Sequence, residues 1–214
     1  NRKYQYEALR AQVNPHFLFN TLNAIRWMAI IRKAGNIVAC IDALATMLKY
    51  SMSRGGELVT LKDELDNINS YIYIYNCRYG NQFTLETDLD RELLELQVVK
   101  FILQPIVENA VIHGFKGSEK QGTIIIYGDV ENGVLKLYAE DNGCGLQKGE
   151  AEARSGRKVT GIGIANVDAR IKSAYGAQYG LLVYNGAVCG TVAEFTLPVL
   201  RQKEEIDAES TGRG

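Results

Sequence analysis

The spacing of apolar residues constrains the fold of this 214-residue chain more than any other feature. Over residues 1–53, apolar side chains recur every three or four positions. Ile37, Ile41 and Leu44, for example, form the seam of a packed helix. Farther along, several segments alternate apolar and polar residues, which is typical of strands with one buried face. The chain is therefore expected to start with helices and to continue into an α+β domain.

Residues 1–53 are expected to form two helices with a turn at Gly35. Phe17, Leu18 and Phe19 are consecutive in the first helix, so they point in three directions. One pair of helices cannot bury an apolar surface that broad, whereas a helical hairpin that dimerises into a four-helix bundle can. The sequence thus predicts an N-terminal dimerisation hairpin.

The rest of the chain predicts helices packed on one face of a mostly antiparallel sheet. A helix is expected from Leu61 to Tyr79 with Thr60 as its N-cap, although the alternation at 71–75 also resembles a strand. Asn132-Gly133 is a strong signal for a hairpin between two strands. The expected strands are 82–88, 123–130, 134–140, 181–184 and 191–197, and the further helices are 96–115 and 162–175.

The expected domain boundaries follow from these patterns. Residues 1–55 form the dimerisation helices, and residues 56–200 form the α+β domain. The tail 201–214 lacks apolar periodicity and is expected to be disordered. Because the chain starts with Asn1 rather than Met, we expect a longer protein in which an upstream segment supplies any sensor or membrane anchor.

The charge balance and the cysteines exclude several classes of protein. With 24 Lys and Arg against 25 Asp and Glu, the net charge is -1, so no strong field recruits nucleic acid or an anionic bilayer. No apolar run approaches the ~18–20 residues that span a membrane, and no signal peptide opens the chain. The cysteines are widely spaced without a CxxC pair, which disfavours zinc and indicates reduced thiols in a cytoplasmic setting.

The first motif with chemical potential is the segment 103–114, LQPIVENAVIHG. On a helix, Asn109 and His113 share a face, with Glu108 beside them and Lys116 following. Such a set suits a magnesium-bound polyphosphate, because Mg²⁺ takes oxygen ligands and basic groups offset phosphate charge. The alternative is an amphipathic helix with a solvated polar face, and this segment alone favours that alternative.

The second motif is Asp141-Asn142-Gly143-Cys144-Gly145, which directly follows an apolar strand. An Asp at a strand end can present its carboxylate to an amino group while glycines let the backbone turn and approach a ligand. The alternative is an ordinary β-turn, which this sequence also favours.

The third motif is Thr160–Val167, which places Gly161 and Gly163 at the start of a helix. Free N–H groups there can bind phosphate oxygens. Asn166 stands where a third glycine would complete GxGxxG, and no apolar strand precedes the motif, so a dinucleotide-binding Rossmann site is disfavoured.

In this order and at these separations, the three motifs resemble the N, G1 and G2 boxes of the GHKL ATPase superfamily, which includes gyrase, Hsp90, MutL and histidine kinases. The resemblance covers roughly residues 80–198 and implies a Bergerat-type sandwich that binds ATP with Mg²⁺. It places Asn109 and Glu108 at the metal and Asp141 on the adenine amino group. The residues assigned to nucleotide binding are Asn109, His113, Lys116, Asp141, Gly143, Gly145, Gly161, Gly163 and Asn166.

The resemblance also implies an ATP lid over residues 143–161. Its candidate phosphate contacts are Arg154, Arg157 and Lys158. The lid lacks the phenylalanine-bearing F box of many histidine kinases, which is a departure from the family pattern.

Residues 9–23, LRAQVNPHFLFNTLN, resemble the phosphoacceptor motif of the LytS/YesM-like sensor histidine kinases. This resemblance makes His16 the candidate nucleophile, because a neutral imidazole can accept a phosphoryl group. The alternative is that Asn14-Pro15 simply starts a helix and His16 is a core or capping residue.

Phe17 stands where many histidine kinases carry an acid after the phosphoacceptor, so no general base is identified. Asn20, one helical turn beyond His16, can orient the imidazole or a water molecule. The candidate catalytic residues are therefore His16, Asn20 and Glu108.

The resemblance implies autophosphorylation of His16 from Mg·ATP, followed by transfer to an aspartate in the receiver domain of a response regulator. It also implies a homodimer, with transfer within or between protomers, in the cytoplasmic portion of a membrane sensor. The alternatives are a GHKL protein-serine kinase and a non-catalytic ATP-binding dimer. A DNA-acting clamp ATPase is disfavoured by the near-neutral charge.

Overall fold

The computed structural model describes residues 15–53, 58–80, 82–115, 121–146 and 162–201. Its elements are α2 (Pro15–Ile31), α3 (Gly35–Met52), β1 (Leu58–Thr60), α4 (Leu61–Tyr79), β2 (Phe83–Asp88), α5 (Arg91–Leu94), β3 (Gln97–Val99), α6 (Gln104–Asn109), the π-helical turn η1 (Ala110–Gly114), β4 (Gly122–Glu131), β5 (Val134–Asp141), α8 (Ile162–Tyr175), β6 (Gly180–Asn185) and β7 (Thr191–Pro198).

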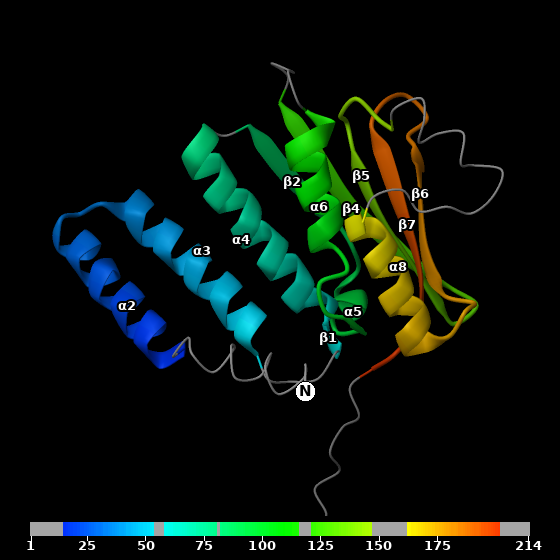
Figure 1. Cartoon of the computed structure of the whole chain (residues 1–214), viewed down its shortest axis with the longest axis horizontal. Coiled ribbons are helices and arrows are strands. Elements are labelled where there is room, and N and C mark those ends of the chain that lie inside the picture. Colours follow the sequence, from blue (N-terminus) through cyan, green and yellow to red (C-terminus); the bar gives the residue numbers. More distant parts are fainter. Residues whose placement is uncertain (1–14, 54–57, 81, 116–120, 147–161, 202–214) are drawn as a thin grey trace, which may run out of the picture.

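The main sheet has five strands in the order β2-β4-β5-β7-β6. β2 runs parallel to β4, and the other neighbours are antiparallel. α4, α6 and α8 lie across one face of this sheet (Figure 1). The α+β architecture with a mostly antiparallel sheet, predicted from the sequence, is thus confirmed.

Alternation along the strands builds the core between the sheet and these helices. Ile124 and Ile126 on β4, and Leu135 and Leu137 on β5, are all buried. Between these strands, Asn132 and Gly133 have φ of 52° and 76°, as a tight hairpin turn requires. The strand predictions over 82–141 are therefore confirmed.

α4 is a helix throughout, so the strand alternative for 71–75 is wrong. Its core-facing residues Leu61, Leu65, Ile68 and Ile72 follow a helical period. Thr60 and Asp63 form a reciprocal capping box, in which the Thr60 hydroxyl accepts the Asp63 N–H at 3.1 Å. The buried helical face outweighs the local alternation.

The predicted helix over 96–115 is wrong in its first half. Residues 97–99 form β3 and pair antiparallel with β1. Phe101 then adopts φ of 59°, which an α-helix cannot accommodate. The helix begins only at Gln104, with Pro105 in its first turn, where a missing N–H is harmless. A strand partner about forty residues upstream has therefore replaced local helix formation.

The N-terminal hairpin packs through α3 against α4, and α2 lies on the far side of α3 (Figure 1). The prediction that Gly35 forms the turn is wrong, because Gly35 is the first residue of α3. The chain reverses at residues 32–34, directly before Gly35, where Lys33 has φ of 55°. Among the described residues, none of the helices is both long and apolar enough to cross a bilayer. The segment before Pro15 and the tail 202–214 lie outside the described residues.

Candidate functional site

Two successive hydrogen bonds, the first of which comes from α4, hold the side chain of Glu108 on α6. Gln104 Nε2 donates to Glu108 Oε1 at 2.6 Å, and Asn67 Nδ2 donates to Gln104 Oε1 at 2.7 Å. Asn67 is buried, so this chain ties the half-buried Glu108 to the interior side of α4. Burial, together with the Glu108 carboxylate, raises the pKa of the nearby Tyr71 to about 12. Sequence reasoning missed Asn67 and Gln104, because no local pattern links positions 37 residues apart.

Asn109 is the last residue of α6, where the helix widens into η1. Such π-helical turns are frequent at functional sites. Within the described part of the chain, no hydrogen bond engages the Asn109 side chain, so its amide oxygen is free to accept a ligand. The predicted α-helical link to His113 is replaced by this π-helical turn, on which His113 is exposed.

Asp141 is the last residue of β5 and is nearly buried, at 9% exposure. Its Oδ1 accepts the N–H of Gly143 at 2.8 Å, and Thr191 donates from its backbone and its hydroxyl. Burial raises the pKa of the Asp141 carboxyl, and these hydrogen bonds partly oppose that shift. The carboxylate therefore has a fixed orientation at the end of a central strand. Thr191 carries no sequence signal for this role.

Two glycines allow the chain to approach Asp141 closely. A Cβ on Gly143 would lie 2.5 Å from the carbonyl oxygen of Gly114, which accepts the N–H of Cys144 at 2.8 Å. Gly190 has φ of 71°, and a Cβ there would lie 1.7 Å from the Asp141 carbonyl oxygen. Sequence reasoning identified Gly143 but missed Gly190, because the crowding comes from a strand distant in sequence.

Gly145 and Leu146, the last described residues before 147–161, are fixed by Asn185. The Leu146 N–H donates to Asn185 Oδ1 at 2.7 Å, and Gly145 has φ of 74°. Asn185 ends β6, and sequence reasoning did not assign it to the site. Most of the predicted lid, with Arg154, Arg157 and Lys158, lies outside the described residues.

The first turn of α8 lies beside the first turn of α6. A Cβ on Gly163 would lie 3.9 Å from Pro105 Cβ, within ordinary contact. Asn166 is exposed on the next turn of α8. Gly161 and Lys116, two further predicted site residues, lie outside the described residues. The structure thus brings α6, the loop after β5 and the start of α8 together.

His16 lies in the first turn of α2 and is exposed. Asn20 Nδ2 lies 3.3 Å from both ring nitrogens, so the amide can donate to an unprotonated nitrogen. α3 and α4 stand between α2 and α6 (Figure 1). The structure therefore pairs His16 with Asn20 but does not bring His16 beside Asn109 or Asp141.

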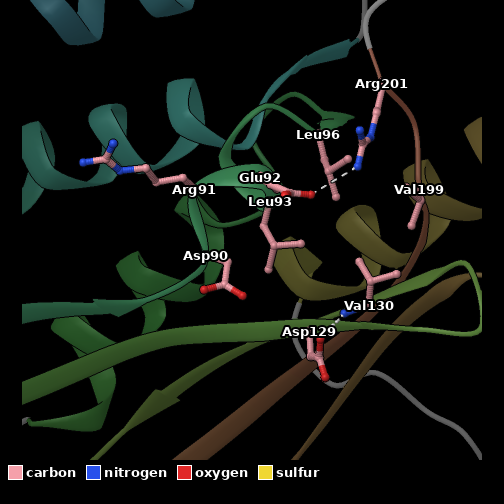
Figure 2. Close-up of a pocket in the computed structure, with 9 residues that line it drawn as sticks. All are labelled: Asp90, Arg91, Glu92, Leu93, Leu96, Asp129, Val130, Val199 and Arg201. Atoms are coloured by element: carbon pink, nitrogen blue, oxygen red, sulfur yellow. Dashed lines mark hydrogen bonds and ion pairs between the residues drawn. The ribbon is translucent and has the colours of Figure 1, made fainter.

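A cavity of about 610 Å³ lies elsewhere, between α5, the turn end of β4 and the chain after β7 (Figure 2). Glu92 and Arg201 in its wall form an ion pair of 3.5 Å. None of the predicted site residues lines this cavity, so it is separate from the candidate site.

The donors at the candidate site can supply part of the coordination shell of a magnesium ion. Among the described residues, no group of three or more His, Cys, Asp and Glu side chains could hold a metal. Asn109 and Glu108 would supply two oxygen ligands from adjacent positions. Mg²⁺ in nucleotide sites commonly takes one or two protein ligands and completes its shell with phosphate oxygens and water, so this set is sufficient.

Comparison with known proteins identifies relatives of the chain. The histidine kinase family model matches residues 4–83, from before α2 to the start of β2. The sensor histidine kinase YesM of Bacillus subtilis is 31% identical over 197 residues, covering 92% of this chain and 34% of YesM. The sensor histidine kinase BtsS of Escherichia coli is 36% identical over 180 residues, covering 84% and 30%. The sensor protein LytS of Staphylococcus epidermidis is 27% identical over 217 residues, covering 98% and 36%.

The chain thus spans about a third of the length of the curated relatives that it matches. Two solved structures share its fold. The histidine kinase domain of the Erythrobacter litoralis EL346 blue-light activated histidine kinase has a TM-score of 0.50 at 16% identity, covering 87% of this chain and 86% of that one. The Acinetobacter baumannii histidine kinase AdeS has a TM-score of 0.50 at 17% identity, covering 85% and 94%. The resemblance predicted from the sequence is therefore confirmed: over most of its length, this chain is similar to sensor histidine kinases of the LytS/YesM type.

Proposed function

We propose that this chain is the kinase portion of a sensor histidine kinase. It would transfer the γ-phosphoryl group of Mg·ATP to His16 and then to an aspartate in the receiver domain of a response regulator. The observation that carries the proposal is the hydrogen bond from the Cys144 N–H to the Gly114 carbonyl oxygen, a contact called here the joint at Gly114. It fixes the loop after Asp141 to the end of the helix that bears Glu108 and Asn109. One backbone contact thereby sets a carboxylate and two oxygen ligands relative to each other.

Each residue at this joint has a distinct role in the proposal. The Asp141 carboxylate accepts the adenine amino group, because Gly143 and Thr191 already hold it in one orientation. Asn109 and Glu108 hold Mg²⁺, which when bound offsets the charge of the phosphates. His113, at the end of this helix, supplies a basic group for the phosphates, and Lys116, three residues later in the sequence, is assigned to the same role. Gly143 and Gly145 form the base of the lid, and Gly163 and Asn166 face the phosphates from α8; Gly161, directly before α8 in the sequence, is assigned to the same role.

His16 acts as the nucleophile of the phosphoryl transfer. One unprotonated ring nitrogen attacks the γ-phosphorus while Asn20, at 3.3 Å, orients the ring. The ADP oxygen leaves as the nitrogen–phosphorus bond forms. Because α3 and α4 separate α2 from α6, transfer requires a rearrangement of the hairpin or a partner protomer (Figure 1).

A homodimer formed through the hairpin fits its surface. Trp27 and Ile31 on α2 are 61% and 76% exposed, and Phe17 is also exposed. Large apolar side chains gathered on one element mark a surface that another protein covers. A second hairpin would complete a four-helix bundle. Membrane attachment, in this proposal, comes through a segment upstream of the present sequence.

Incubation with γ-labelled ATP, followed by mapping of the modified residue, tests the proposal. Label that is lost in acid and maps to His16 is expected. His16→Gln should abolish labelling and leave ATP affinity unchanged, because the two sites lie on different helices. Acid-stable label would instead indicate the serine-kinase alternative. ATP binding without any label would indicate a non-catalytic ATP-binding dimer.

A further inference from the structure

Residues 100–103 lead into α6. Lys100, the first of them, forms hydrogen bonds with the end of α3 and with α8. The Lys100 side chain is nearly buried, and its ammonium group donates to Ser53 Oγ at 2.9 Å and to the Ser51 carbonyl at 3.3 Å, at the end of α3. Its carbonyl oxygen accepts Arg170 Nη2 of α8 at 2.5 Å. The segment therefore connects the hairpin with α8.

A third helix contacts the same segment through Glu64 of α4, which is 0% exposed. Its carboxylate accepts the N–H of Leu103 at 3.0 Å and the N–H of Phe101. Leu103 is the N-cap of α6 and has no capping side chain of its own. Glu64 thus supplies from another helix the acceptor oxygens that the unpaired N–H groups at the start of a helix require.

Tyr50 links this carboxylate to the hairpin. The residue lies near the end of α3, and its hydroxyl donates to Glu64 Oε1. The N–H of Phe101 also lies 3.3 Å from the hydroxyl oxygen, which can accept it. The ring packs edge-to-face on Phe101 with centroids 4.9 Å apart, and Lys100 Nζ lies 4.9 Å from the Tyr50 centroid. Ring and hydroxyl therefore make separable contacts.

The backbone at this point is itself unusual. Phe101 has φ of 59°, which a bulky residue adopts only when its surroundings impose it. The hydrogen bonds from Phe101 to Glu64 and Tyr50 are the surroundings that do so. A displacement of α3 that moved the Tyr50 hydroxyl would therefore act directly on the residue that sets the direction of α6.

We propose that Tyr50 and Glu64 are positioning residues, which hold the helix bearing Glu108 and Asn109 in register with the hairpin bearing His16. Neither residue touches the nucleotide. Both act through the backbone of Phe101 and Leu103 on the start of α6, so they govern the rate of transfer and not the affinity for ATP. The inference rests on the proposed kinase function.

Tyr50→Phe tests this role, because it deletes the hydroxyl and keeps the ring. The rate of His16 phosphorylation should fall about tenfold, the loss that ~1.4 kcal/mol of transition-state free energy produces. The ATP dissociation constant should change less than about twofold, as expected when ground-state binding is untouched. Tyr127→Phe is the matched control, since it also removes a tyrosine–glutamate hydrogen bond, of 3.1 Å to Glu140. Both residues lie in the part of the chain from β1 to β7, called here the sheet domain. That variant should phosphorylate at the wild-type rate.

A double-mutant cycle with Glu64→Gln adds a second readout. If the two side chains act as a unit, the double variant should be no slower than the slower single variant. Additive losses, or a wild-type rate in Tyr50→Phe, would overturn the proposal. Equal losses in Tyr50→Phe and Tyr127→Phe would also overturn it, because they would indicate a general effect on stability.

Amide hydrogen exchange separates this inference from the proposed kinase activity, since it needs no catalysis. In the full chain, Tyr50→Phe should speed exchange in peptides that cover residues 101–114, and Tyr127→Phe should not. If the wild-type protein fails to phosphorylate His16 but shows this exchange pattern, the kinase proposal fails and the coupling stands. Unchanged exchange over 101–114 in Tyr50→Phe would refute the coupling itself.

Discussion

The helical hairpin and the sheet domain differ in how they use their apolar side chains. Ile68 and Phe195 in the sheet domain are 0% exposed and belong to one core between the helices and the sheet. Trp27 and Ile31, on α2, lie largely in solvent. The sheet domain therefore buries its apolar side chains between its own helices and sheet, whereas the hairpin leaves an apolar surface that no other described residue covers.

This difference separates two parts of the proposed reaction. The geometry around Asp141 depends on contacts among β5, η1 and β7, all within the sheet domain. The position of His16 depends on α2, which touches the rest of the described chain mainly through α3. ATP binding should therefore depend on the sheet domain alone. Phosphoryl transfer to His16 should depend on both the sheet domain and the hairpin.

The first prediction concerns the stability of the two regions. Ile68→Ala should lower the free energy of unfolding by about 2–5 kcal/mol, because it opens a cavity in the core. Ile31→Ala, at a surface position of the same residue type, should change it by less than about 0.5 kcal/mol. Urea unfolding at a protein concentration where the chain is monomeric measures both. If Ile31→Ala lowered the free energy of unfolding as much as Ile68→Ala, the hairpin surface would contribute to stability as the core does, and the two regions would not differ in this respect.

A second change acts on the site inside the sheet domain. Gly190→Ala should cost about 2–4 kcal/mol of stability, because the new Cβ collides with the Asp141 carbonyl and the backbone has positive φ. It should also weaken ATP binding by displacing Asp141. Gly133→Ala is the control, with φ of 76° and nothing within 4 Å of the added Cβ. It should cost about 1–2 kcal/mol and leave ATP affinity intact. Equal effects of the two variants would contradict the role of Gly190.

Most of the sheet domain could be predicted from the sequence because its signals are local. Alternation in 123–130 and 134–140 fixed two strands, and Asn132-Gly133 fixed their register. The helix over 162–175 was likewise predicted with its observed bounds. In each case, the spacing of apolar residues within the strand or helix is enough to predict which of its faces is buried.

The parts that could not be predicted depend on partners far apart in the sequence. β3 was taken for helix because its partner, β1, lies about forty residues upstream. Gly190 and Asn185 were not assigned to the site, since their contacts with Asp141 and Leu146 appear only when β5, β6 and β7 are adjacent. The assignments of His16 and Asn109 came from the resemblance to a family, and they stay predictions.

The exposed surface of the hairpin leads to a third prediction, of intermediate size. Trp27→Ser should weaken self-association about tenfold, or ~1.4 kcal/mol, because it removes a large apolar side chain from the proposed bundle. Sedimentation equilibrium measures this change. Val188→Ser is the control, since Val188 is 96% exposed but lies in the sheet domain. A chain that is monomeric as wild type, or equal effects of both variants, would remove the argument that the hairpin dimerises.

The last prediction concerns the pH dependence of ATP binding by the sheet domain. Because burial raises the pKa of Asp141, its carboxyl takes up a proton at a higher pH than an exposed aspartate does. The ionised form accepts the adenine amino group, so ATP affinity should be full above the raised pKa and fall as the pH drops through it. The fall can be at most about tenfold per pH unit, or 1.36 kcal/mol, for a single proton.

Calorimetry at a series of pH values, from about pH 8 downward towards the ordinary pKa of an aspartate carboxyl, follows this decline. Asp141→Asn keeps an oxygen acceptor without a titrating group, so its weaker ATP affinity should lack this component of the pH dependence. His16→Gln should follow the wild-type curve, because the hairpin does not take part in binding the adenine. If His16→Gln altered the curve and Asp141→Asn did not, nucleotide recognition would depend on the hairpin, and the two regions would not be separable.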